Sequence, residues 1–254
     1  MKYHNLYPPF VDRIFTSQKN AKNPEKAAKT KLHQLYGAYT LPNSNKKASQ
    51  IIKMLTKETI SIENINKLLK LHASTNERIP FYKDFYDFII KSTGNVKSIL
   101  DLGCGFNPFS IPFLPMKICE YHAIDIDVQV MELTNIFFDI LGLPPNAVCA
   151  DLDSCIPKIN VDLTFMLKLL PVLEANNPGK AYKLLDELST KWLVITFPTR
   201  SLGGKKKGMK ENYQKSFINA LNENSFMNYD LVSENCFGNE LMFILQHKGR
   251  ISKL

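Results

Sequence analysis

The sequence predicts an α/β domain built on a parallel sheet, preceded by an all-helical domain. From residue 96 onward, short apolar stretches typical of buried strands alternate with longer stretches typical of helices. Residues 1–95 show only the helical spacing of apolar residues, with almost no glycine. A glycine turn at 103–105 directly follows the first expected strand, as in folds that bind a nucleoside cofactor. We therefore expect a helical domain over residues 1–95 and an α/β domain over 96–254.

The N-terminal region is expected to hold at least three helices and to carry most of the positive charge. Apolar residues recur at helical spacing, a break falls at Pro42–Asn45, and Ser61 is suited to start a new helix. Residues 1–50 contain nine basic and two acidic residues, whereas the whole chain has a net charge of +8. This surplus of basic residues favours a surface that contacts phosphates over a helix face that is merely solvated. We expect nucleic acid, rather than a membrane, as the partner.

The region after residue 96 is expected to hold five strands and three helices, followed by a terminal hairpin of two strands. The hairpin strands would be joined at Gly238-Asn239. The expected strands lie near 97–102, 120–125, 146–149, 161–166 and 191–197, and the expected helices near 108–115, 128–141 and 179–190.

Composition excludes several other classes of protein. The chain is 44% hydrophobic, which is sufficient for a globular core. Its five cysteines show no Cys-x-x-Cys spacing, so we expect neither a zinc ribbon nor a disulfide framework, and no metal site. The N-terminus lacks the apolar core of a secretion signal, and no apolar run approaches the length of a membrane span. These features predict a cytoplasmic protein in a reducing compartment.

The most informative segment runs from residue 98 to residue 109. An apolar strand ends at Asp101, and Gly103 and Gly105 allow the backbone to turn sharply and approach a ligand closely. Asn107-Pro108 then suits a helix start, with Asn107 as the N-cap. Strand, glycine turn and helix N-terminus in this order form a cradle for a small-molecule cofactor.

The second expected strand ends in two acids, Asp125 and Asp127, either of which could hold a ribose. The third glycine of a dinucleotide motif is absent, and no P-loop occurs. Asp101-x-Gly103-x-Gly105 resembles motif I of the class I, Rossmann-like, S-adenosylmethionine (AdoMet) methyltransferases. A structural turn without a ligand is the alternative interpretation.

Other candidates lie around this turn. Thr75 is suited to cap a helix whose first turn would contain Arg78, and Arg78 could clamp the carboxylate of AdoMet or pair with an acid on the surface. His72 is expected to be a packed or capping histidine. Asp151 follows the third strand, where an acid can accept a hydrogen bond from adenine or be a solvated loop residue. Lys168 follows the fourth strand, and we favour an exposed lysine over a phosphate contact.

The second most informative segment is the expected loop at 200–213. It leaves the fifth strand at the edge where ligands bind in open α/β sheets. Arg200 and Lys205 would attract a phosphate backbone, and Met209 and Tyr213 offer apolar surface to a nucleobase. The alternative is a disordered, solubilising loop. We favour the functional interpretation, because the loop lies beside the presumed methyl donor.

These segments together resemble the aminoglycoside-resistance 16S ribosomal RNA (guanine-N7) methyltransferases over about residues 31–245. The most specific are His-Ala-Ser-Thr-Asn-Glu-Arg at 72–78 and Ser-Leu-Gly-Gly-Lys at 201–205. The matching segments are 31–39, 71–78, 99–108, 123–127, 167–174, 197–205, 208–213 and 238–241.

The resemblance implies AdoMet-dependent methylation of N7 of guanine 1405 in the decoding-site helix, within the 30S subunit, with resistance to aminoglycosides. It implies that Arg78 holds the cofactor carboxylate, Asp125 the ribose, and Asp151 with Leu152 the adenine. The glycine turn would line the methionine part, and the loop at 200–213 would contact the target nucleotide.

No acid or base catalyst is expected, because guanine N7 already offers a lone pair to a sulfonium methyl. The rate would instead come from aligning the reacting atoms. We expect a monomer. Two alternatives stay open at this point: methylation of another RNA base such as adenine N1, and a non-catalytic RNA-binding protein with a vestigial cofactor pocket.

Overall fold

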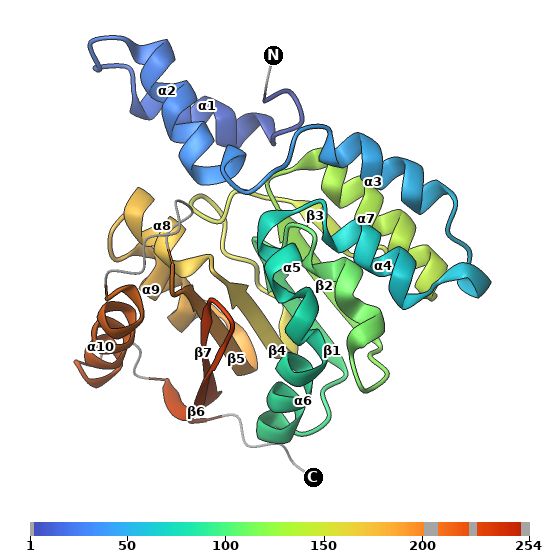
Figure 1. Ribbon diagram of the computed structural model, residues 1–254. Coiled ribbons are helices and arrows are strands. Elements are labelled where there is room, and N and C mark those ends of the chain that lie inside the picture. Colours follow the sequence, from blue (N-terminus) through green and yellow to red (C-terminus); the bar gives the residue numbers. More distant parts are fainter. Residues whose placement is uncertain (1–2, 201–207, 224–227, 250–254) are drawn as a thin grey trace. The chain divides into compact units, whose positions relative to one another are not determined.

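The computed structural model describes residues 3–200, 208–223 and 228–249. Every element of regular secondary structure in residues 3–93 is a helix (Figure 1), and the change to alternating strands and helices falls between residues 93 and 98. The helices before that point are α1 (Pro8–Ser17), α2 (Pro24–Leu32), the π-helix η1 (His33–Gly37), α3 (Ser44–Lys53), η2 (Lys57–Thr59), α4 (Ile62–Leu69), α5 (Ala73–Arg78), η3 (Ile79–Phe81) and α6 (Tyr82–Thr93).

Seven strands of the described residues form one mixed sheet in the order β3-β2-β1-β4-β5-β7-β6. β4 is parallel to both β1 and β5, β2 is parallel to β3, and β7 is antiparallel to both β5 and β6. The predicted strands and the terminal hairpin are confirmed within one or two residues. The strands are β1 (Ser98–Leu102), β2 (Glu120–Asp125), β3 (Ala147–Cys149), β4 (Asn160–Leu167), β5 (Ser189–Pro198), β6 (Tyr229–Phe237) and β7 (Glu240–His247).

The helices of this region differ more from the sequence prediction. α7 (Val128–Leu141) has the predicted bounds, and the expected helix at 108–115 is the 3-10 helix η4 (Asn107–Phe113). The helix predicted over 179–190 ends earlier, because α9 (Lys180–Glu187) is followed at once by β5. α8 (Leu170–Asn176) and α10 (Met209–Asn222) were not predicted.

The chain forms two compact units whose segments interleave along the sequence. The first comprises Met1–Ile79, Gly105–Pro112 and Ala123–Asp151. The second comprises Pro80–Cys104, Phe113–His122 and Leu152–Leu254.

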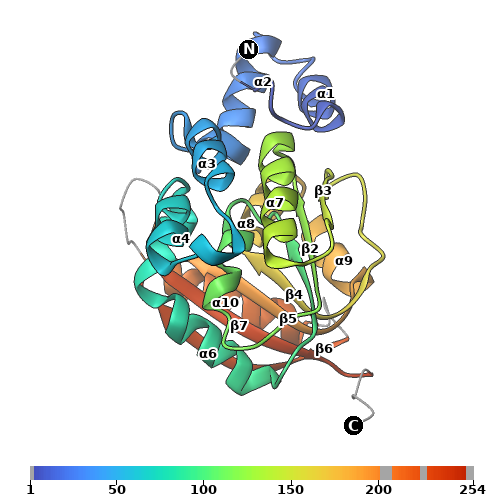
Figure 2. The ribbon, with the colours of Figure 1, turned by 90° about the vertical axis from the view of Figure 1, so that its right-hand side faces the viewer.

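In the first unit, local capping signals and apolar faces build the helices. The side chain of Asn23 accepts a hydrogen bond from the backbone N–H of Lys26 and so caps α2, with Pro24 in the first turn. α1 and α2 pack together, and α3 lies beside α7 (Figures 1 and 2). The core between the first two helices consists of Leu6, Phe10, Ile14, Ala28 and Leu32.

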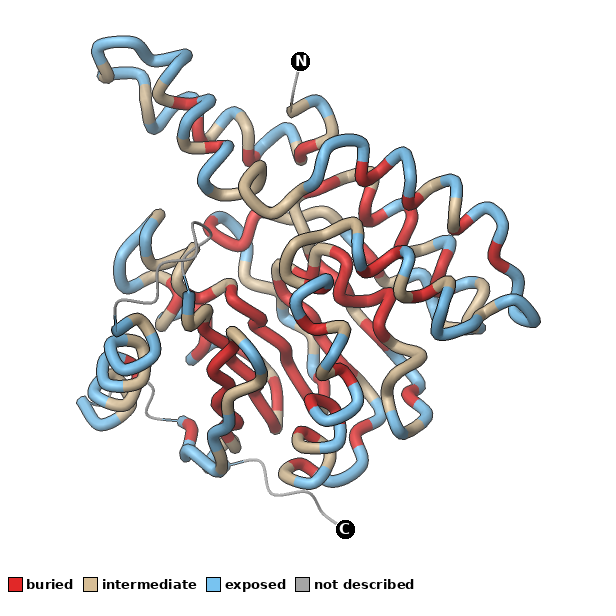
Figure 3. The backbone as a smooth tube through the Cα atoms, viewed as in Figure 1, coloured by how far each residue is buried: buried red, intermediate tan, exposed pale blue. Residues whose placement is uncertain are grey.

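In the second unit, the core follows the strands. β4, β5 and β7 are buried along most of their length (Figure 3), as expected for strands covered on both faces. Within the described ranges, no helix has the length and apolar character required to cross a bilayer.

Candidate functional site

The glycine turn after β1 requires glycine at both predicted positions. Gly103 and Gly105 have φ values of 60° and 49°, in the left-handed region that other residues rarely adopt. A Cβ atom on Gly103 would lie 2.7 Å from Cδ1 of Leu169, and one on Gly105 would lie 3.2 Å from Nε2 of His72. A side chain at Gly103 would thus be both strained and crowded.

Asp101, the last acid before the turn, is fully buried in the second unit. Its Oδ2 atom accepts a hydrogen bond of 2.6 Å from the hydroxyl of Tyr121. Burial is the main cause of the raised pKa of Tyr121, and the nearby charge of Asp101 raises it further. The phenol therefore keeps its proton and remains a hydrogen-bond donor. This hydrogen bond links β1 with β2, so Asp101 stabilises the end of the strand from which the turn starts.

Asp125, at the end of β2, is hydrogen-bonded to the backbone of the glycine turn. Its Oδ2 accepts a hydrogen bond of 2.8 Å from the N–H of Gly105, and its Oδ1 accepts bonds from the N–H groups of Ile126 (2.7 Å) and Asp127 (3.1 Å). Despite these donors, burial raises the pKa of Asp125 to about 6. The carboxylate is only partly exposed, so a ligand that donates to it would meet a poorly solvated acceptor.

Asp127 has a different role in the structure. It is 1% exposed and caps α7 by accepting a hydrogen bond of 3.0 Å from the N–H of Val130. Its other oxygen accepts hydrogen bonds from Nδ2 of Asn45 (2.9 Å) and from the hydroxyl of Tyr36. Residue type alone left Asp125 and Asp127 equivalent, and the resemblance pointed to Asp125. In the structure Asp127 is buried as a helix cap, whereas Asp125 is partly exposed.

Arg78 is 3% exposed, and its Nη1 donates a hydrogen bond of 3.1 Å to Oδ1 of Asn107. Two predictions about its surroundings are wrong. Arg78 lies in the last turn of α5, where its charge complements the helix dipole, because the helix starts at Ala73. Thr75 is therefore not a cap, and its hydroxyl donates to the carbonyls of Leu69 and His72.

Two other predictions about this part of the first unit can be compared with the structure. Asn107 lies within η4 and accepts from Arg78, whereas the sequence predicted it as a helix cap. His72 is packed, as predicted, because its ring stacks on that of Phe106 with 5.6 Å between ring centroids. Arg78 thus contacts Asn107, and His72 packs on Phe106 close to Gly105.

Asp151, the acid after β3, is bound by a residue that the sequence analysis missed. Nε and Nη2 of Arg13 donate to Oδ2 and Oδ1 of Asp151 over 2.5 Å and 2.9 Å. Asp151 is 4% exposed, and the guanidinium carbon of Arg13 lies 5.4 Å from the centroid of the Phe10 ring. Leu152, the next residue along the chain, is also buried. A single sequence contains no signal for a pair 138 residues apart.

Lys168 is buried, so the predicted exposed lysine is wrong. It is 9% exposed, has a left-handed φ of 59°, and its Nζ lies 3.5 Å from Oε2 of Glu240. The backbone N–H of Lys168 donates to Thr196, whose hydroxyl donates to Oε1 of Glu240 over 2.5 Å. This network is part of the second unit and holds the turn that places Leu169 against Gly103.

The predicted loop at 200–213 is partly helical. Arg200 is exposed, and Lys205 lies outside the described residues. Met209 and Tyr213 belong to α10, not to a loop. The ring of Tyr213 stacks on that of Phe197 with 5.1 Å between centroids, and burial raises the pKa of Tyr213. Tyr213 is only half-buried, so part of its ring remains available for contact.

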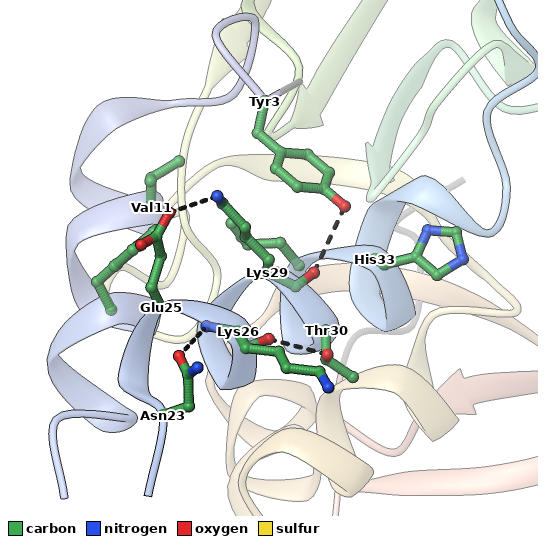
Figure 4. Close-up of a pocket in the computed structure, with 10 residues that line it drawn as sticks. Tyr3, Val11, Asn23, Glu25, Lys26, Lys29, Thr30 and His33 are labelled. Carbon is green, nitrogen blue, oxygen red and sulfur yellow. Dashed lines mark hydrogen bonds and ion pairs between the residues drawn. The ribbon is translucent and has the colours of Figure 1, made fainter. Parts of the chain in front are cut away.

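The basic N-terminal helices form a hollow of about 750 Å³ over α1 and α2 (Figure 4). Lys29 forms an ion pair of 2.5 Å with Glu25 beside it. A second hollow of about 460 Å³ on α2 is lined by Lys22, Lys26 and Lys31, among others. The first hollow is lined by Tyr3, Val11, Phe15, Asn23, Glu25, Lys26, Lys29, Thr30, Leu32 and His33.

No group of three or more His, Cys, Asp or Glu side chains among the described residues is arranged to hold a metal ion.

One family of known proteins matches most of the chain. The model of the family described as ribosomal RNA methyltransferase (FmrO) matches residues 2–244. A 16S rRNA (guanine(1405)-N(7))-methyltransferase of Serratia marcescens is 33% identical, over 98% of this chain and 94% of that protein. A protein of the same name from Micromonospora rosea is 29% identical, over 97% of this chain and 92% of that protein.

Solved structures agree with this match. The 16S rRNA methyltransferase RmtF, in complex with S-adenosyl-L-homocysteine, superimposes with a TM-score of 0.85 at 30% identity, covering 97% of this chain and 93% of that one. The 16S rRNA methylase RmtB gives a TM-score of 0.79 at 28% identity, with the same coverage. The family match includes residues 2–30, which the resemblance seen in the sequence did not cover.

Proposed function

The chain belongs to the ribosomal RNA methyltransferase (FmrO) family, and we propose that it methylates N7 of guanine 1405 in 16S rRNA. The observation that carries this proposal is the match to relatives of that name over nearly the full length of both chains. The substrate is the 30S subunit, on which the basic N-terminal helices dock. Methylation at this nucleotide gives resistance to aminoglycosides, and the enzyme acts in the cytoplasm as a monomer.

The residues of the structure fit AdoMet as the methyl donor. The glycine turn ends at the partly exposed carboxylate of Asp125, which accepts a hydrogen bond from the N–H of Gly105, and the RmtF relative was solved with S-adenosyl-L-homocysteine, the product of this cofactor. AdoMet supplies an electrophilic methyl group on sulfur. Asp125 accepts hydrogen bonds from the ribose hydroxyls, because its carboxylate is partly exposed and poorly solvated. Asp127 supports Asp125 by capping α7.

The two ends of the cofactor are held by charge and by apolar contact. The guanidinium of Arg78, aligned by Asn107, binds the carboxylate of the methionine part. Asp151 accepts a hydrogen bond from the amino group of adenine, and Leu152 packs against the ring. The glycine turn, held by Asp101, lines the methionine part.

The target base is held by residues around α10. Met209 and Tyr213 offer partly exposed apolar surface on one helical turn, where a guanine taken out of its RNA stack can rest. Arg200 and Lys205 attract the flanking phosphates. No general base takes part, because N7 carries a lone pair, so these residues accelerate the reaction by alignment alone.

Transfer of tritium from labelled AdoMet to purified 30S subunits tests this function. We expect incorporation into intact 30S subunits and little into naked 16S RNA. Chemical cleavage at N7-methylguanine should then map the product to position 1405, and subunits with adenine at that position should stay unlabelled. A stop at another nucleotide would indicate a different RNA base as the acceptor, and no incorporation would favour a non-catalytic RNA-binding protein.

A separate test concerns the cations of the target segment. Replacing Lys205, Lys206 and Lys207 with methionine should slow methylation of 30S subunits while the affinity for S-adenosyl-L-homocysteine stays the same. The same replacement at Lys97, Lys117 and Lys158, which are exposed and lie outside the N-terminal helices, removes equal charge elsewhere and serves as the control. Equal activity of both triple variants would show that the 205–207 run is only solvated charge.

A further inference from the structure

The N-terminal segment reaches the end of β2 by several backbone contacts, all within the first compact unit. The N–H of Tyr7 donates to the carbonyl of Ile126 over 2.8 Å, and the N–H of Val128 donates to the carbonyl of Asn5 over 2.8 Å. Leu6 and Asp127 form an antiparallel bridge between these two bonds. The chain that leads into α1 is thus attached directly beside Asp125.

Arg13, on α1, extends this attachment to the end of β3. Its two hydrogen bonds to Asp151 use the planar fork of the guanidinium, which matches the two oxygens of a carboxylate. The guanidinium carbon of Arg13 also lies 5.4 Å from the centroid of the Phe10 ring, a contact that favours this position of the fork. Asp151 is nearly inaccessible, so this pair is not an ordinary surface ion pair.

Asp151 is also tied to Asp125. β2 and β3 pair so that Asp125 lies opposite Cys149, and the N–H of Ala150 donates to the carbonyl of Asp125 over 3.1 Å. The backbone that leads to Asp151, the acid assigned to adenine, is therefore hydrogen-bonded to that of Asp125, the acid assigned to the ribose. α1 contributes the cation that binds the carboxylate of Asp151.

We propose that Arg13 is a positioning residue for the adenine of the cofactor, acting through Asp151. This inference rests on the proposed function, because it requires Asp151 to face adenine. The Arg13 fork binds both oxygens of the carboxylate and so fixes its plane, which sets the direction from which the 6-amino group of adenine donates to it.

The test compares two ligands that differ at one position of the ring. S-adenosyl-L-homocysteine carries the 6-amino donor, whereas S-inosyl-L-homocysteine carries a 6-oxo acceptor at the same place. We expect the wild-type protein to prefer the adenosyl ligand strongly in calorimetry. Arg13→Met should lower the affinity for the adenosyl ligand about tenfold or more, while the affinity for the inosyl ligand changes little. The preference for the adenosyl ligand therefore falls.

Two further variants make the result specific. Arg13→Lys keeps the charge but not the fork, so we expect an intermediate preference. Lys53→Met removes the same charge from an exposed position on α3 and should leave the preference unchanged. If Arg13→Met does not fold, as judged by circular dichroism, the ratio measured for Arg13→Lys decides the question.

Two outcomes would overturn the inference. A folded Arg13→Met protein with the wild-type preference would show that Asp151 needs no orientation from α1. An equal loss of affinity for both ligands would show that the ion pair only stabilises the fold. Failure of the wild-type protein to bind S-adenosyl-L-homocysteine is a different result, since it would contradict the proposed function itself.

Discussion

The substitution Asp125→Asn is expected to abolish a dependence of cofactor binding on pH that the wild-type protein shows near pH 6. Desolvation dominates over the three backbone donors around this carboxylate and raises its pKa from 3.8 to about 6. Ribose hydroxyls donate to the charged carboxylate and so favour its ionised form. The cofactor should therefore bind best above pH 6 and lose affinity as the pH falls through that value.

The size of the effect follows from the shift. A rise in the pKa of Asp125 from 3.8 to about 6 means that the folded protein favours the neutral carboxyl over the carboxylate by about 3 kcal/mol more than the unfolded chain does. Because the folded-state pKa lies above the unfolded one, the free protein loses this amount of stability as the pH rises from 3.8 to 6. If the cofactor restores an ordinary pKa, its affinity should fall about tenfold between pH 7 and pH 5.

Calorimetric titration with S-adenosyl-L-homocysteine at pH 5, 6 and 7 measures this directly. The wild-type protein should bind about tenfold more weakly at pH 5 than at pH 7, with proton release on binding near pH 6. Asp125→Asn should bind weakly with a flat profile, because an amide does not titrate. The exposed carboxylate of Asp139 provides a matched control, and Asp139→Asn should keep the wild-type profile. A flat wild-type profile, or a slope that persists in Asp125→Asn, would refute the reasoning.

Three further variants test other parts of the site. Gly103→Ala should lower the free energy of unfolding by about 1–3 kcal/mol in urea denaturation, because its Cβ would crowd Leu169 at a left-handed φ; unchanged stability would mean that the turn can shift. Arg78→Ala should weaken cofactor binding in calorimetry without unfolding the protein, and an unaltered affinity would count against its contact with the carboxylate. Lys168→Met should cost about 3 kcal/mol in thermal unfolding because it leaves Glu240 buried without its cation, and adding Glu240→Gln should recover part of the loss; additive losses would contradict a direct pair.

Much of the fold could be predicted because its signals are local. α7 has the predicted bounds, since Asp127 caps its start and Gly142 adopts a left-handed conformation at its end. The terminal hairpin turns at Gly238, which has a φ of 55°. A few neighbouring residues suffice for each of these features, so a short window of sequence contains the whole signal.

The errors occurred where local signals conflict with the fold. The glycines and lysines before residue 209 favoured a loop, yet α10 starts at Met209 and packs its aromatic face on β5. Thr75 looks like a helix cap in sequence, but α5 starts at Ala73. Lys168 looks exposed by its residue type, and its burial depends on a partner 72 positions later in the sequence, Glu240.

The sequence by itself determined the glycine turn, the acids at the ends of two strands and the basic N-terminal segment, because backbone conformation and charge are properties of residues close together in the chain. Only the tertiary structure distinguished the surroundings of the three acids. Asp127 caps α7 and accepts from Tyr36 and Asn45, Asp125 accepts from the backbone of the turn, and Asp151 accepts from Arg13. These partners come from distant segments that meet only when the apolar faces of the helices pack, so no short window of sequence contains them.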